Sequence, residues 1–222
     1  MIKSIPIVFL FLIISSCTTT HTGNISEERS QEEDIKIEVE AYLFDAKLRQ
    51  DGKPTSVRLF FYQTDSIIAI GGKGYLGKGA LKGWVNNDSL CVIFPTMNEY
   101  VYESIDDMFS SFSCSGEIPK FNLTALFKSL PDETDQFAFA EITTLDADAD
   151  RPRFRIKFPG CKWKINVTYD KQDAGYRIRN FNFNDGAGNS LNGKRREYKA
   201  SSQVSLSQFE VEIDDSMNRI IP

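Results

Sequence analysis

Residues 35–43 read Ile-Lys-Ile-Glu-Val-Glu-Ala-Tyr-Leu, and this stretch decides the fold. An apolar set alternates with a second set along it with a period of two, which predicts a β-strand with one buried face. The apolar set is Ile35, Ile37, Val39, Ala41 and Leu43, and the second is Lys36, Glu38, Glu40 and Tyr42. Shorter β-branched and aromatic runs follow at residues 57–62, 66–70, 80–85, 89–94 and 99–102. Asp-Gly, glycine-rich and Asn-Asn-Asp turns separate these runs, so we expect an antiparallel meander.

Two helices are predicted in the centre of the chain, over residues 104–112 and 122–130. In the second, Asn122 is a candidate N-cap and Pro131 ends the helix, while one apolar stripe consists of Leu123, Leu126, Phe127 and Leu130. Strand patterns resume at residues 154–158, 162–169, 176–183, 202–206 and 209–213. Strands, a helical insertion and strands again predict an α+β domain in which one antiparallel sheet curls around the helices.

The chain begins with a short apolar leader that ends at Cys17. Lys3 supplies a positive charge, and residues 5–14 are almost wholly apolar. About ten apolar residues are too few to cross a bilayer of roughly 30 Å, which takes about 20 residues of helix. An isoleucine, two serines and a cysteine resemble the lipobox of bacterial lipoproteins, which implies cleavage before Cys17 and acylation of its thiol and its new amine. An ordinary signal peptide with an incidental cysteine is the alternative.

Residues 18–34 are polar and charged and offer almost no apolar side chain to bury, which is typical of a flexible tether. Such a tether would hold the domain about 20–25 Å from the lipid. Several acyl chains, at about 0.8 kcal/mol per buried methylene, would anchor the chain stably. We therefore expect a cleaved signal peptide (1–16), a lipidated cysteine with its tether (17–34) and one folded domain (35–222).

The composition narrows the possible partners. The 222 residues include 26 Lys and Arg and 31 Asp and Glu, which gives a net charge of −5, and the leader removes only Lys3. This acidic balance argues against a nucleic-acid partner.

Of the cysteines after Cys17, Cys91 lies in an apolar strand pattern and is expected to be a buried free thiol. Cys114 and Cys161 lie beside loop-like sequence and could form a disulfide, although spacing alone does not fix the pairing.

Three groups of short motifs resemble the LolB family. They are the turn Gly74-Tyr75-Leu76-Gly77, the segment Ile118-Pro119 leading into Leu123, Leu126 and Leu130-Pro131, and Trp163-Lys164 ahead of Tyr169-Asp170. LolB is the outer-membrane lipoprotein that receives other lipoproteins from the periplasmic carrier LolA. The resemblance implies an unclosed antiparallel β-barrel with a helical lid, around a hydrophobic cavity that takes acyl chains. A LolA-like carrier and lipoprotein cargo are the partners it implies.

The resemblance also implies a membrane-insertion loop at Tyr75 and Leu76, because the family has a leucine on a protruding loop after an early strand. A leucine gains about 1.5–3 kcal/mol when it is fully removed from water, so a bilayer could bury this tip. The alternative is that Tyr75 and Leu76 fold back onto the edge of the sheet. The loop departs from the family in carrying Lys73, Lys78 and additional glycines; these lysines could meet lipid headgroups.

Motifs that bind nucleotides or metals are incomplete. Residues 72–78 fit a glycine-rich phosphate loop in part, but residues 80–85 contain a glycine and have a strand pattern, whereas phosphate binding needs a helix there. Asp146, Asp148 and Asp150 match the start of a calcium loop, yet Arg151 and Lys157 occupy the positions that need Gly and Glu. A solvated acidic loop is the better interpretation, and we expect no metal and no cofactor beyond the lipid on Cys17.

The sequence contains one histidine, His21, in the tether, so histidine-based catalysis in the domain is excluded. Ser/Lys and paired-carboxylate sites leave little local signature, so a hydrolase of that kind remains an alternative.

We expect a monomeric, non-catalytic lipoprotein that accepts or inserts lipids or lipoproteins. Thr18 replaces the aspartate that retains lipoproteins at the inner membrane in some bacteria, which indicates the outer membrane, at its periplasmic face. The second hypothesis is an envelope scaffold or interaction lipoprotein whose barrel is filled by its own aromatic side chains.

Overall fold

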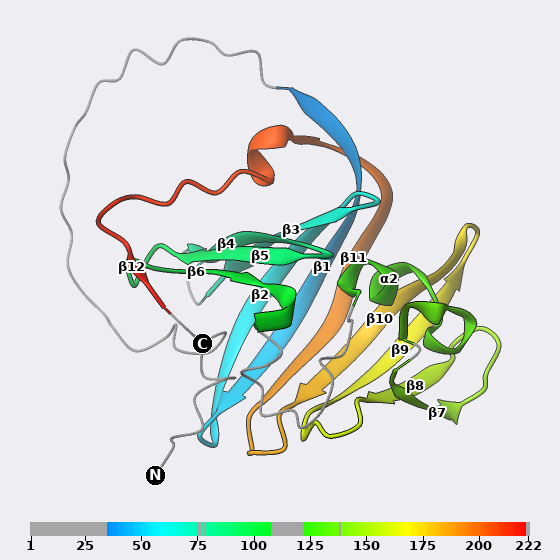
Figure 1. Cartoon of the computed structure of the whole chain (residues 1–222). Coiled ribbons are helices and arrows are strands. Elements are labelled where there is room, and N and C mark those ends of the chain that lie inside the picture. Colours follow the sequence, from blue (N-terminus) through cyan, green and yellow to red (C-terminus); the bar gives the residue numbers. More distant parts are fainter. Residues whose placement is uncertain (1–34, 75–76, 78, 108–121, 138, 221–222) are drawn as a thin grey trace.

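The computed structural model describes residues 35–74, 77, 79–107, 122–137 and 139–220. Twelve strands of these residues form one sheet in the order β12-β6-β5-β4-β3-β2-β1-β11-β10-β9-β8-β7. All neighbouring pairs are antiparallel except β12 with β6, which is parallel. The sheet is strongly curved and unclosed (Figure 1).

The first half of the sheet is the meander predicted from the sequence. Its strands are β1 (Lys36–Gln50), β2 (Lys53–Gln63), β3 (Ile67–Lys73), β4 (Gly79–Asn86), β5 (Ser89–Phe94) and β6 (Glu99–Ser104). Asp51 and Gly52 connect β1 to β2 with φ values of 48° and 78°. Both are left-handed, as a two-residue type I′ hairpin requires, and this turn fixes the register of the two longest strands of the meander.

The second half follows the helical segment. It contains α2 (Leu123–Lys128), the short 3₁₀ helices η3 (Pro131–Glu133) and η4 (Asp135–Phe137), and the strands β7 (Glu141–Asp146), β8 (Arg153–Lys157), β9 (Lys164–Gln172), β10 (Gly175–Asn184) and β11 (Ser190–Ser205). β11 pairs with β1 along almost its whole length and joins the two halves. The chain then runs through η5 (Leu206–Gln208) to β12 (Asn218–Arg219), at the edge beside β6.

The main apolar core lies on the concave face of the sheet, around α2. α2 contacts β10 in one half and β4 in the other, and Figure 1 shows it between the two halves. Asn122 caps the helix as predicted, because its Oδ1 accepts a hydrogen bond from the Ala125 N–H at 2.9 Å. Of the other predicted helix, residues 105–107 are helical and residues 108–112 lie outside the described part. A helical insertion is therefore present, but the described part of the lid is small.

Two other expectations differ from the structure. Residues 209–213 are not a strand: Phe209 follows η5 and packs with Val39 and Ala69 in a separate apolar cluster, so it anchors the C-terminal segment against the sheet. β11 begins at Ser190, well before the predicted start at residue 202, and β7 was not predicted. β7 is mostly exposed to solvent and β11 consists mostly of polar residues, so neither shows the apolar alternation on which the prediction rests.

Cys91 is a buried free thiol, as predicted, and Cys161 is disulfide-bonded. Cys114 lies outside the described residues, so the pairing of Cys114 with Cys161 stays a prediction. None of the helices in the described ranges is long and apolar enough to cross a bilayer.

Candidate functional site

The concave face is built from alternate residues of strands in both halves of the sheet. Tyr42, Phe44 and Ala46 of β1 are buried there, and Val167 and Tyr169 of β9 reach the same core from the other half. Alternation along each strand explains the arrangement, because every second side chain points to this face. The result is one apolar interior shared by both halves of the sheet.

α2 occupies this interior in the structure. The Phe127 side chain is 3% exposed, and the centre of its ring lies 5.1 Å from that of Tyr42, 5.1 Å from that of Phe61 and 6.2 Å from that of Phe44. Leu126 is buried beside it. The interior between the two halves is therefore filled in part by side chains of α2.

Two buried polar side chains hold the backbone of α2. Gln63 of β2 donates from Nε2 to the Thr124 carbonyl at 3.0 Å, and the Tyr169 hydroxyl of β9 donates to the Leu126 carbonyl at 3.0 Å. The Gln63 Oε1 atom is buried without a hydrogen-bond partner among the described residues. Burial raises the pKa of Tyr169, so its hydroxyl keeps the proton that it donates. One hydrogen bond thus comes from each half of the sheet, and together they fix α2 across the opening.

A buried ion pair lies at the C-terminal end of α2. Arg177 binds Glu40 through two hydrogen bonds of 2.9 and 3.0 Å, and the Tyr42 hydroxyl donates to the same carboxylate at 2.6 Å. Lys128 of α2 lies 3.9 Å from Glu40. Burial lowers the pKa of Arg177, but its hydrogen bonds and charge interaction with Glu40 outweigh burial and raise it. This pair joins the two halves and keeps Arg177 charged.

A second ionic cluster closes the space where β10 and β11 separate. The two strands pair only from Asn180 onward. Before that point, Arg195 donates to the Ile178 carbonyl at 2.8 Å and pairs with Asp170 at 2.8 Å, and Asp170 also binds Arg179 at 2.8 Å. The arginine thus replaces missing backbone hydrogen bonds, which is a structural role.

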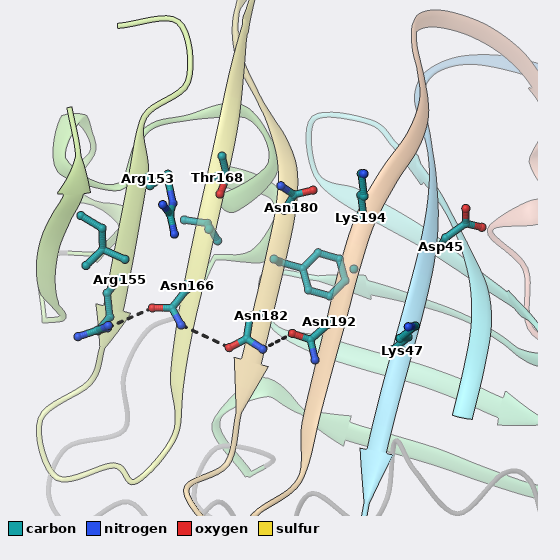
Figure 2. A pocket seen from close by; sticks show the side chains of 14 residues that line it. Asp45, Lys47, Arg153, Arg155, Asn166, Thr168, Asn180, Asn182, Asn192 and Lys194 are labelled. Atoms are coloured by element: carbon teal, nitrogen blue, oxygen red, sulfur yellow. Dashed lines mark hydrogen bonds between the residues drawn. The ribbon is translucent and has the colours of Figure 1, made fainter. Parts of the chain in front are cut away.

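A groove of about 730 Å³ lies on the opposite face of the sheet. It runs over β1, β11, β10, β9 and β8, on the side that points away from α2. Figure 2 shows its side chains standing on this face. One row across the strands follows the register and contains Asp45, Lys194, Asn180, Thr168 and Arg153. This row carries two cations and one carboxylate.

The neighbouring row contains Lys47, Asn192, Asn182, Asn166 and Arg155. Its side chains form a directional chain of hydrogen bonds (Figure 2): Arg155 Nε donates to Asn166 Oδ1 at 3.1 Å, Asn166 Nδ2 donates to Asn182 Oδ1 at 3.3 Å, and Asn182 Nδ2 donates to Asn192 Oδ1. The chain orients all three amide groups in one direction. We call these two rows the outer groove.

The structure places the predicted site residues as follows. Cys17, Tyr75 and Leu76 lie outside the described residues, so lipidation and membrane insertion stay predictions. At the ends of that loop, the Gly77 N–H donates to the Gly74 carbonyl at 3.2 Å. β4 follows it, as the strand pattern predicted, so the loop does not open a helix that could hold phosphate.

The acidic loop also has the simple structure expected of it. Asp146 and Asp148 each accept a hydrogen bond from the backbone N–H two residues on, at 3.2 and 2.9 Å, and Arg151 pairs with Asp170 at 3.3 Å. No group of three or more His, Cys, Asp or Glu side chains within the described ranges could hold a metal ion.

Sequence reasoning missed the outer groove. Its signal was the polar half of the strand alternation, such as Arg153 and Arg155, Asn166 and Thr168, or Asn180 and Asn182. Polar alternate residues normally face solvent, and only the pairing of the strands reveals that these form two continuous rows.

No protein-family model matches the chain, and no curated protein matches it. Among solved structures it is similar to an uncharacterized conserved protein from Thermus thermophilus, at 9% identity and a TM-score of 0.45, covering 82% of this chain and 89% of that one. It is also similar to a DUF1329 family protein from Desulfovibrio piger, at 8% identity and a TM-score of 0.44, covering 78% and 89%. A third is a "putative outer membrane lipoprotein-sorting protein domain" from Vibrio parahaemolyticus, at 9% identity and a TM-score of 0.40, covering 72% and 84%. These likenesses are too distant for function to be transferred.

Proposed function

We propose that this protein is a lipid-anchored binding protein of the bacterial outer membrane, facing the periplasm, and that its half-barrel takes acyl chains of lipids or lipoproteins when α2 moves off the concave face. In this proposal Cys17 carries the lipid, the tether of residues 18–34 keeps the domain near the bilayer, and a LolA-like carrier supplies lipoprotein cargo. The protein works as a monomer and by apolar burial, without catalysis and without a metal or cofactor.

The observation that carries the proposal is the way α2 covers the concave face. An apolar interior formed by both halves of the sheet is closed by a helix of six residues, whose backbone is held by Gln63 and Tyr169. Displacing so short a helix breaks few contacts compared with opening the sheet itself. It would expose aromatic surface from β1, β2 and β9, and this surface suits an acyl chain.

The second candidate function is an envelope scaffold or interaction lipoprotein with a permanently filled barrel. The edge-to-face contacts of Phe127 with Tyr42 and Phe44, at interplanar angles of 81° and 80°, favour it, since rings at this geometry stabilise each other beyond simple burial. In that case α2 belongs to the core and does not move.

Binding of a fluorescent fatty acid separates the two functions. We expect the mature lipidated chain in neutral detergent to bind the probe, and the double variant Gln63→Leu and Tyr169→Phe to bind it more tightly, because α2 loses both hydrogen bonds. Tyr176→Phe is the matched control, since the Tyr176 hydroxyl bonds the Ala149 carbonyl at an exposed site. The acyl-binding proposal would be refuted if native mass spectrometry found no bound lipid and neither the parent chain nor the double variant bound the probe.

The proposed membrane-insertion loop has its own test. Leu76→Glu should reduce transfer of a lipoprotein or lipid to liposomes, because a charged tip cannot enter the bilayer, and it should leave thermal stability unchanged. Unchanged transfer would mean that Leu76 is merely exposed. A loss of thermal stability would mean that Leu76 packs against the sheet.

A further inference from the structure

We propose that the outer groove binds an anionic saccharide, that is, one or more sugar units that carry carboxylate or phosphate groups. This site lies on the face opposite α2, so it does not depend on acyl binding. The recognising groups are the four cations Lys47, Arg153, Arg155 and Lys194, together with the amide chain of Asn166, Asn182 and Asn192.

The groove is positively charged in a protein whose net charge is −5. Four cations and one carboxylate line it. In the described part of the chain, none of these four cations forms an ion pair with a carboxylate. Asp45 is neutralised from outside the groove, by Arg58 at 3.5 Å and Arg196 at 3.8 Å. The local excess of positive charge is therefore available to an anionic ligand.

The hydrogen-bonding groups point to a ligand rich in acceptors. An amide carries two N–H donors, so Asn166 and Asn182 each keep one N–H after their bond within the chain. Arg155 likewise uses only Nε toward Asn166, which leaves its two terminal nitrogens for a ligand. Such a guanidinium can bind a carboxylate or a phosphate through two parallel hydrogen bonds.

The remaining groups favour a sugar over a simple anion. Asn180 lines the groove, and its Oδ1 atom is buried without a hydrogen-bond partner among the described residues. Turning this amide toward the groove would let a sugar hydroxyl donate to it, and the Thr168 hydroxyl beside it can donate or accept. Free phosphate carries only one or two protons at neutral pH, so it offers fewer such donors than a sugar. The volume of about 730 Å³ also suits a short oligosaccharide better than one ion.

The experiment is titration calorimetry on the lipidated protein in phosphatidylcholine nanodiscs. The probes are tetragalacturonate for the carboxylated source, glucose 6-phosphate for the phosphorylated source, and neutral maltotetraose and inorganic phosphate as controls. We expect one or both anionic sugars to bind with one molecule per chain, with an affinity that falls as salt is raised. Maltotetraose and inorganic phosphate should bind at least about tenfold more weakly.

Variants locate the site. Arg155→Gln should weaken binding of the sugar at least about tenfold, and the pair Lys47→Gln and Lys194→Gln should do the same without affecting folding, because both lysines are exposed. Lys53→Gln removes an exposed lysine outside the groove and should leave binding unchanged. Equal binding of neutral sugar or inorganic phosphate, or no binding of any sugar, overturns the proposal. So does binding only to phosphatidylglycerol vesicles, which would assign these cations to the membrane surface.

Discussion

Truncating Phe127 to alanine tests the packing of α2 most severely. The side chain is 3% exposed and contacts the rings of Tyr42, Phe44 and Phe61. Removal of a buried phenylalanine costs about 3–5 kcal/mol, the larger values applying where the surroundings cannot collapse. α2 is a short helix that can shift toward the vacated space, so we place the cost near the lower end, at about 3 kcal/mol.

The assay is urea unfolding followed by tryptophan fluorescence. With a denaturant slope of about 2–3 kcal/mol/M, a cost of about 3 kcal/mol lowers the midpoint by about 1–1.5 M. Phe139→Ala is the matched control, because Phe139 is 61% exposed and the same truncation there should change stability by less than about 0.5 kcal/mol. The vacated volume should also admit the fluorescent fatty acid, so the probe should restore part of the lost stability.

A loss below about 1 kcal/mol for Phe127→Ala would refute this reasoning, because it would mean that the ring is not a packed part of the core. If Phe127→Ala lost the predicted stability but did not bind the probe more tightly, the packing of Phe127 would be supported and its link to acyl chains would be contradicted.

Three more predictions concern other parts of the fold. Gly193→Val should destabilise the protein by about 1–3 kcal/mol in urea unfolding, because a Cβ there would lie 2.3 Å from the Phe181 ring. Gly79 has open space around it, so Gly79→Ala should be nearly neutral. Equal effects of the two substitutions would contradict the packing of Gly193 against Phe181. The free energy of unfolding should fall as pH rises above about 10, where the unfolded tyrosines lose their protons. Burial raises the pKa of both Tyr42 and Tyr169, and Glu40 raises that of Tyr42 further, so the folded protein keeps both hydroxyls protonated. The double variant Tyr42→Phe and Tyr169→Phe should therefore make the free energy of unfolding depend less on pH above about 10. An unchanged dependence on pH would contradict this prediction. Cys91 should resist thiol reagents until the protein unfolds, because it is buried and burial raises its pKa; rapid labelling of Cys91 would contradict this. Peptide mapping should find Cys161 linked to Cys114, and a different partner of Cys161 would overturn the predicted disulfide.

Much of the sheet could be predicted because its strands have one buried face. The strand β1, the Asp51-Gly52 turn and the cap at Asn122 each have a local physical signal, and the structure confirms them. The predicted face of β1 is wrong beyond Val39, because a register shift before Ala41 moves Tyr42 to the buried side. β11 could not be found in the same way, because it consists mostly of polar residues and its second half is held only by pairing with β1. Phe209 shows the opposite error, since one buried aromatic beside apolar neighbours imitated a strand.

The candidate sites divide along the same line. The apolar stripe of the helix predicted that Leu126 and Phe127 would be buried, and they are. The sequence could not show that they fill the interior, because this depends on how far the two halves of the sheet curl. The outer groove depends on the registers of five strands, so residues as far apart in the chain as Lys47 and Asn192 become neighbours only after folding.

The most direct test of the central claim is hydrogen–deuterium exchange of residues 123–128, measured on the lipidated protein with and without a saturating fatty acid. If α2 leaves the concave face to admit an acyl chain, amide exchange in this segment rises when the fatty acid binds, while exchange in β1 and β11 stays slow. If exchange in α2 stays the same or slows although the fatty acid is bound, the helix does not move and the account is contradicted.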